Sequence, residues 1–186
     1  MSNITTNITT GVIPFDNTEN TPTLTDEVLF AKTKINAIIP SKRDEDGWYD
    51  IYPCFDSNYV RIEPRSIKLV PTGIASAFNP KYRIGLFERG SNTKSGLIVM
   101  AGRIDSGFRG EWFVALFNTN DIPVYISKEA QELEKGSKFI TIPYSKAIAQ
   151  ASVEKVPQVQ IQEVDYKEIL NIKSERGIGM LGSTNK

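Results

Sequence analysis

Residues 102–110 read Gly-Arg-Ile-Asp-Ser-Gly-Phe-Arg-Gly and lie between two apolar runs, residues 96–101 and 111–118. Glycine tolerates the backbone angles of tight turns and lets other groups approach the backbone closely, so the stretch predicts a β-hairpin. Asp105 and Phe108 stand three residues apart on the turn, which can place an acid or base and a stacking ring in one small cavity. A surface turn with a solvated aspartate has the same composition, and the hairpin alone leaves both interpretations open.

The composition is that of one globular domain with a sizeable core. The chain has 186 residues, 40% of them hydrophobic, and lysine plus arginine equals aspartate plus glutamate at 22 each. With no net basic field, binding to nucleic acid or to an anionic membrane is disfavoured. No apolar run approaches the roughly 18 residues of a membrane span, and the N-terminus lacks the order of a signal peptide. We therefore expect a cytoplasmic protein, in the host cytoplasm if the source is a virus.

The residue types in the sequence restrict its chemistry. Cys54 is the single cysteine, so an internal disulfide is impossible, and the absence of histidine excludes the usual zinc sites and histidine-based triads. Nothing near Cys54 supplies a base, which favours a small buried hydrophobe over a nucleophile. Catalysis would rest on carboxylates, amides and hydroxyls, with or without a bound hard cation.

Short alternating stretches separated by turn signals dominate the chain and predict an all-β sandwich. Residues 1–25 are rich in Thr, Asn and Ser and predict a disordered or strand-exchanging arm. The β domain is expected over residues 26–173, and residues 174–186 form a glycine-containing tail. The expected strands are residues 29–39, 47–52, 59–62, 67–70, 82–88, 111–117, 138–143 and 156–164, followed by a polar connector over 165–173.

Two of these segments carry polar groups suited to a site. Strand 47–52 would place Trp48, Asp50 and Tyr52 on one face, because side chains alternate along a strand. The loop at residues 89–91, Arg-Gly-Ser, would present backbone amides, a guanidinium and a hydroxyl, which is the kind of donor set that phosphate recognition needs.

Five segments match, in order, the motifs of one family. They are Gly-Trp-Tyr-Asp-Ile-Tyr at 47–52, Glu-Arg-Gly-Ser at 88–91, the hairpin at 102–110, Ala-Ile-Ala-Gln at 147–150 and Arg-Gly-Ile-Gly-Met-Leu-Gly-Ser-Thr at 176–184. The hairpin is similar to the family's third motif, Gly-Val-Ile-Asp-x-x-Tyr-Arg-Gly. On these segments the chain resembles the trimeric dUTP diphosphatase (dUTPase) family from about residue 30 to the C-terminus, and it is compatible with a phage-type member.

The resemblance implies a jelly-roll-like β-sandwich that assembles as a homotrimer. Each site would be built from neighbouring subunits, with residues 174–186 acting as a mobile phosphate-binding lid. The implied reaction is hydrolysis of dUTP to dUMP and diphosphate, which removes dUTP from the nucleotide pool and supplies dUMP for thymidylate synthesis. Mg²⁺ is the implied cofactor, held by substrate phosphates and water.

The resemblance also implies residue roles. Asp105 would be the general base for the attacking water, and Gln150 would orient that water or a phosphate oxygen. Backbone groups of the hairpin, at Gly102 and Ile104, would read the uracil edge, while Phe108 would exclude a 2′-hydroxyl by its bulk. The other implied substrate-binding residues belong to the first, second and fifth motifs: Asp50, Arg89, Gly90, Ser91, Arg176, Gly182, Ser183 and Thr184.

Several positions depart from the family pattern. The hydroxyl of the second motif has moved to Ser91, Ala147 replaces an arginine, and Leu181 replaces the phenylalanine that stacks on uracil. These changes leave open a non-catalytic or altered-specificity nucleotide-binding relative. A dCTP deaminase is less favoured, because Ala115 stands where those enzymes carry their catalytic glutamate.

Overall fold

The computed structural model describes residues 24–129, 136 and 138–179. Its contacts divide the chain into two compact units, residues 1–155 and residues 156–186. The predicted arm lies almost wholly outside the described residues, and the predicted domain boundaries stay predictions. No helix in the described part of the chain is long and apolar enough to cross a membrane.

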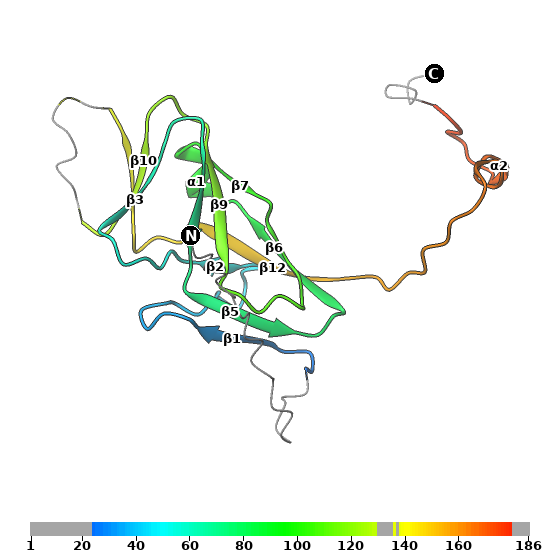
Figure 1. Ribbon diagram of the computed structural model, residues 1–186, viewed down its shortest axis with the longest axis horizontal. Coiled ribbons are helices and arrows are strands. Elements are labelled where there is room, and N and C mark those ends of the chain that lie inside the picture. The colour runs from blue at the N-terminus through cyan, green and yellow to red at the C-terminus, as the bar shows by residue number, and fades with distance from the viewer. Residues whose placement is uncertain (1–23, 130–135, 137, 180–186) are drawn as a thin grey trace, which may run out of the picture. The chain divides into compact units, whose positions relative to one another are not determined.

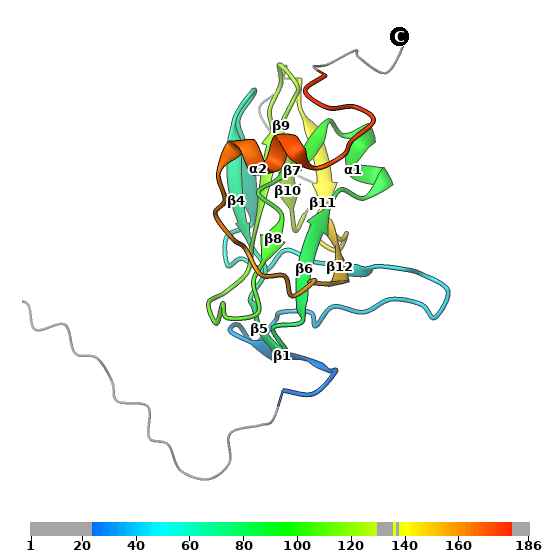
Figure 2. The ribbon, with the colours of Figure 1, turned by 90° about the vertical axis from the view of Figure 1, so that its right-hand side faces the viewer.

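The described residues of the first unit form four small sheets (Figure 1). Only β10 and β11 pair in parallel, and the other described pairs are antiparallel. One short helix, α1 (Gly90–Lys94), follows directly at the end of β6 (Figure 2). In sheet order the strands are β1 (Val28–Lys32) and β5 (Ile74–Phe78); β11 (Ile140–Pro143), β10 (Val124–Ser127) and β3 (Tyr59–Ile62); β2 (Tyr49–Ile51), β12 (Ala149–Lys155), β6 (Tyr82–Phe87) and β8 (Arg103–Ile104); β4 (Ile67–Pro71), β9 (Phe113–Asn118) and β7 (Leu97–Met100).

The core follows from the period-2 pattern of the strands. In β9, Val114 and Leu116 are fully buried and alternate with the more exposed Phe113 and Ala115. Trp112, just before β9, is also fully buried, and its indole nitrogen donates to the hydroxyl of Ser76 at 3.1 Å. That bond satisfies the polar atom of the largest core side chain. The predicted all-β class is confirmed.

The turn around Gly73 ties β1 to the core. Gly73 has a positive φ of 67°, and an added Cβ would lie 2.9 Å from the Cys54 sulfur, so glycine is required for both conformation and space. Cys54 is buried, as predicted for a small hydrophobe. The predicted strand 29–39 is shorter than expected because the amides of Thr33 and Lys34 both donate to the Gly73 carbonyl, at 2.7 and 3.4 Å, and turn the chain after β1.

The second unit corrects the predicted last strand. Residues 156–164 form no strand, and two apolar side chains in the middle of the segment are exposed, Val159 by 73% and Ile161 by 95%. An alternating sequence pattern does not by itself form a strand, because a strand also needs backbone hydrogen bonds to a neighbouring strand, and this segment has no such neighbour.

The polar connector predicted over residues 165–173 also needs correction, since it contains a short helix, α2 (Tyr166–Asn171). Asp165 starts this helix: its carboxylate accepts a hydrogen bond from the Lys167 amide at 2.8 Å. Aspartate is favoured at this position because its side chain pairs an amide that the first helical turn leaves unbonded.

Candidate active site

Asp50, Arg89 and Gln150 come from segments that one sheet places side by side. On the strand β12, Gln150 is paired with Asp50 of β2 on one side and with Phe87 of β6 on the other. Directly paired residues of antiparallel strands project from the same face, and Arg89, two positions after Phe87, extends that face. The register of these strands therefore brings together three residues that are distant in the sequence, since Asp50 and Gln150 are 100 positions apart.

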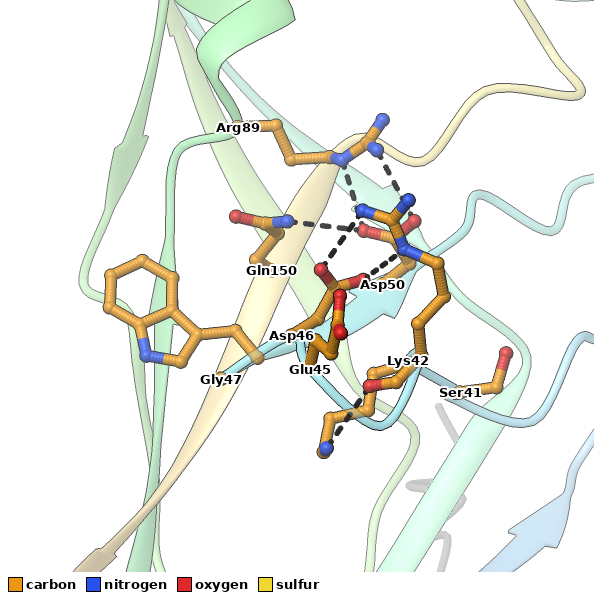
Figure 3. Close-up of a pocket in the computed structure, with 10 residues that line it drawn as sticks. Ser41, Lys42, Glu45, Asp46, Gly47, Asp50, Arg89 and Gln150 are labelled. Carbon is orange, nitrogen blue, oxygen red and sulfur yellow. Dashed lines mark hydrogen bonds and ion pairs between the residues drawn. The ribbon is translucent and has the colours of Figure 1, made fainter.

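The three side chains form one polar cluster (Figure 3). Arg89 contacts both oxygens of Asp50, with Nε 3.0 Å from Oδ1 and Nη2 donating to Oδ2 at 3.2 Å. Gln150 Nε2 donates to Asp50 Oδ1 at 3.4 Å. Both charged side chains are 26% exposed, so the pair is largely withdrawn from water. A two-point contact fixes the plane of the guanidinium, which retains donors that Asp50 does not use.

A cavity of about 850 Å³ opens over this cluster, and the loop between Pro40 and Tyr49 makes its other wall. The loop is closed by a bridge between Ser41 and Asp50. Within it, Arg43 donates to both oxygens of Asp46, from Nε at 2.9 Å and from Nη2 at 3.0 Å. The hydrogen bond and charge of Arg43 lower the pKa of the Asp46 carboxyl. The lining residues are Ser41, Lys42, Arg43, Glu45, Asp46, Gly47, Trp48, Asp50, Arg89 and Gln150.

A second cavity of about 500 Å³ shares Arg89 and Gln150 with the first. Gly90 and Ser91 line it together with Lys146, and both are exposed. The loop predicted at 89–91 is instead the start of α1, with Arg89 at its N-cap and Gly90 and Ser91 in its first turn. The buried side chain of Asn92 anchors this helix by donating to the Ile148 carbonyl. The structure brings the predicted residues of the first, second and fourth motifs to these two adjoining cavities.

The predicted hairpin is present, with a wide connection between the paired strands β7 and β9. Gly102 is required there, because an added Cβ would lie 2.2 Å from the Leu86 carbonyl oxygen. Ile104 is buried and pairs with Ile84 of β6, which fixes the base of the hairpin to the sheet.

The tip of the hairpin faces solvent. Asp105 and Phe108 are exposed, and the Phe108 amide donates to the Asp105 carbonyl at 3.0 Å. Neither side chain lines the two cavities. In the sheet order β2-β12-β6-β8, the hairpin strand lies at the opposite edge from β2 and Asp50. Within one chain the tip of the hairpin, with Asp105 and Phe108, is therefore separate from the Asp50 cluster.

Comparisons with known proteins identify the family. Residues 35–131 match the family model described as dUTPase. A deoxyuridine 5'-triphosphate nucleotidohydrolase of Nautilia profundicola is 34% identical over 159 residues, which cover 83% of this chain and 96% of the relative. The chain belongs to the dUTPase family.

Solved dUTPase structures share the fold. Staphylococcus bacteriophage 80alpha dUTPase with dUpNHpp has a TM-score of 0.68 at 21% identity, over 87% of this chain and 100% of that one. A mutant dUTPase from phage phi11 of S. aureus, described as coordinating a structural Mg(II) ion, has a TM-score of 0.60 at 19% identity, over 76% of this chain and 99% of that one. The predicted dUTPase-type sandwich is confirmed.

The segment predicted to be the fifth motif begins in the second unit. Arg176 Nε donates to the Gly179 carbonyl at 3.1 Å, and the Gly179 amide donates to the Arg176 carbonyl at 3.0 Å. These bonds describe a turn within that unit. The other expected lid residues lie outside the described residues, so their roles stay predictions; they are Gly182, Ser183 and Thr184. The same holds for Leu181, which differs from the family pattern.

The dUTPase cavity does not resemble a protein metal cage. Over residues 24–129, 136 and 138–179, no group of three acidic or cysteine side chains could hold a metal ion. The Asp50 carboxylate already accepts hydrogen bonds from Arg89 and Gln150. The expectation that Mg²⁺ is held by substrate phosphates and water stays a prediction.

The sequence-based interpretation missed part of the dUTPase cavity. Lys42, Arg43 and Asp46 were given no role from the sequence, yet they line the cavity wall. Trp48 was placed on the same strand face as Asp50 but was given no role. A tryptophan two positions from a site carboxylate on one strand face was the signal that could have identified it.

Proposed function

We propose that this chain is a dUTP diphosphatase, which hydrolyses dUTP to dUMP and diphosphate. The observation that carries the proposal is the convergence of Asp50, Arg89 and Gln150 on one cavity in a chain of the dUTPase family. The names of its relatives and the nucleotide analogue bound to the phage enzyme support the same substrate.

Arg89 binds the phosphates in this proposal, and Asp50 holds its guanidinium in place through two contacts. Gly90 and Ser91 add donors from the adjoining cavity, and Gln150 orients a phosphate oxygen or the attacking water. Asp105 is the general base that takes the proton of this water as it attacks the α-phosphorus. Correct positioning of the carboxylate supplies much of the rate enhancement.

The substrate is the magnesium complex of dUTP. When bound, Mg²⁺ neutralises the charge that builds up on the leaving diphosphate. The protein's own contribution is to bind the phosphates with Arg89 and to read the uracil edge with the backbone of Gly102 and Ile104. Phe108 narrows the sugar site against a 2′-hydroxyl, and residues from Arg176 onward close over the phosphates.

A homotrimer completes the site, because the hairpin with Asp105 and the cavity with Arg89 are separate within one chain. One sheet face supports such an assembly. On the sheet β4-β9-β7, neighbouring apolar side chains are 40 to 60% exposed, and contiguous exposed apolar surface often marks a contact with another chain. They are Ile67, Leu69, Ile98, Met100 and Phe113.

This activity would remove dUTP from the nucleotide pool and supply dUMP. We place it in the cytoplasm, and in the host cytoplasm if the chain is viral, as its phage neighbours suggest. The proposed partners are dUTP and two further copies of the chain, with no nucleic acid or membrane.

The test is diphosphate release from a panel of deoxynucleoside triphosphates in the presence of Mg²⁺. The wild-type protein should act on dUTP in preference to dTTP and dCTP. Asp105→Asn should lose most of the turnover and still bind dUpNHpp, since the amide keeps the shape of the carboxylate but cannot accept the proton. A panel in which dUTP stays intact would overturn the proposal.

A further inference from the structure

Trp48 forms an ordered aromatic stack at the rim of the Asp50 cavity. Its ring lies 4.7 Å from that of Phe87, centroid to centroid, with the planes only 22° apart. Gly85 makes room for this arrangement, because an added Cβ at Gly85 would lie 2.7 Å from the Phe87 ring. The guanidinium of Arg103 lies 5.4 Å from the same Phe87 ring. The stack is therefore supported from the sheet.

The Trp48 ring is nevertheless 41% exposed. The other tryptophan, Trp112, is fully buried in the core. Phe87 covers one face of the Trp48 ring, and the ring lines the cavity that also holds Arg89. A large aromatic ring that is positioned but left open at a cavity rim presents a surface on which another flat group can stack.

The cavity therefore has two chemically different parts. Three cations, Lys42, Arg43 and Arg89, line the cavity beside three carboxylates, Glu45, Asp46 and Asp50. The guanidinium donors of Arg89 that Asp50 does not use suit phosphate oxygens, and the indole of Trp48 suits a planar, uncharged ring. A ligand that carries both a flat ring and a polyanion is a nucleotide. In this sequence Leu181 stands where the family resemblance places a stacking phenylalanine, and Trp48 offers an aromatic surface on another element.

We propose that Trp48 is a specificity-determining residue that stacks on the nucleobase of the bound nucleotide. The inference rests on the proposed function for the identity of that nucleotide. Trp48 binds the base and leaves the chemical step to Asp105, so its loss weakens nucleotide binding while turnover at saturation changes little. One stacking contact corresponds to roughly a three- to tenfold change in the dissociation constant.

The test compares Trp48→Ala, Trp48→Phe and wild type by calorimetry with two probes, dUpNHpp and inorganic triphosphate. Trp48→Ala should bind dUpNHpp about three- to tenfold more weakly and Trp48→Phe should recover part of the loss. Both variants should bind triphosphate like the wild type, because it has no base. The matched control is Tyr59→Ala: Tyr59 is also 41% exposed and packs on another ring, Tyr125, but lies outside both cavities.

Tryptophan fluorescence gives a second readout in the wild-type protein. Bound dUpNHpp should quench the emission and protect it from acrylamide, and Trp48→Phe should remove this response, since Trp112 is inaccessible. The inference is wrong if Trp48→Ala binds dUpNHpp as tightly as the wild type, or if its affinity for triphosphate falls by the same factor as its affinity for dUpNHpp. It is also wrong if Trp48 in the assembled protein is protected from acrylamide before any nucleotide is added. If dUpNHpp quenches and protects the Trp48 emission of the wild type but dUTP stays intact, the proposed function is contradicted and the stacking by Trp48 is not.

Discussion

At the scale of single residues, the site depends on the two-point contact between Arg89 and Asp50. We predict that Arg89→Lys weakens binding of dUpNHpp roughly tenfold, because a lysine keeps the charge but cannot make the planar two-point contact. Calorimetry measures the change. Arg83→Lys is the matched control: Arg83 lies on β6, the strand that precedes Arg89, pairs with Glu154 at 2.8 Å and lies outside both cavities. Equal affinities for all three proteins would contradict a phosphate-binding role for Arg89.

The cavity wall has a pH dependence of its own. Arg43 lowers the pKa of Asp46 below its ordinary value of 3.8, first through their hydrogen bond and then through charge. The pair therefore stabilises the loop fully above about that value, and the contribution is lost as the pH falls through the lower pKa of the folded protein.

The corresponding prediction is that Arg43→Gln returns the Asp46 pKa toward 3.8. A carboxyl-carbon NMR titration measures it. Asp121 serves as an internal reference, because Arg65 lowers its pKa in the same way at a remote site and should continue to do so in the variant. If the Asp46 pKa does not move, the short contact to Arg43 does not persist in solution.

At the scale of elements, the base of the hairpin depends on one close backbone approach. The Leu86 amide donates to the Gly102 carbonyl at 2.8 Å, and an added Cβ at Gly102 would lie 2.2 Å from the Leu86 carbonyl oxygen. We predict that Gly102→Ala lowers the free energy of unfolding by about 1–3 kcal/mol, as overpacking does, and reduces dUTP turnover. Gly107→Ala, on the same hairpin with nothing within 4 Å of the added Cβ, should unfold like the wild type in urea. If Gly102→Ala leaves the free energy of unfolding unchanged, the strands can move apart freely at this point.

The elements also show how far sequence could predict this protein. Stretches such as Tyr59–Ile62 were predictable because alternation coincides with a hydrogen-bonding neighbour, here β10. The segment 156–164 has alternation without such a neighbour, and prediction failed there. The positions of Asp50, Arg89 and Gln150 were assigned from motifs, but their meeting depends on strand register, which residue spacing does not encode. The cavity wall at residues 42–46 was not predictable, because a charged turn has the same sequence whether it faces solvent or a site.

At the scale of the whole molecule, the uncovered face of the β4-β9-β7 sheet leads to a prediction about assembly. Leu69 is 60% exposed there, and a charge at its position would have to be buried if this face is an interface. Leu69→Asp should therefore give monomers in light scattering, where the wild type should give trimers, and should lose dUTP turnover. Ile35→Asp is the control, since Ile35 is 88% exposed on a loop outside this sheet and should leave assembly unchanged. A monomeric wild type that turns over dUTP would rule out sites shared between chains.

A further prediction concerns closure over the phosphates by residues 175–186. Fixing a backbone costs roughly 1–2 kcal/mol per residue, so a closing segment must gain its free energy from charge-assisted contacts to the triphosphate, made by Arg176, Ser183 and Thr184. Deleting residues 175–186 should then strongly reduce dUTP turnover. The trimer and its unfolding temperature should hardly change, because side chains 174–178 are exposed and add little packing.

Leu181→Phe in the full chain separates the two sources of aromatic contact. If Trp48 alone stacks on the base, the added ring should tighten dUpNHpp binding by roughly 0.5–1.5 kcal/mol in the wild type, because it covers the second face of the base. The same gain should persist in a Trp48→Ala background, since the two rings act on opposite faces and their contributions add. A gain that appears only when Trp48 is absent would mean that both rings compete for one face. For the deletion described above, undiminished dUTP turnover without residues 175–186 would show that this segment takes no part in closure.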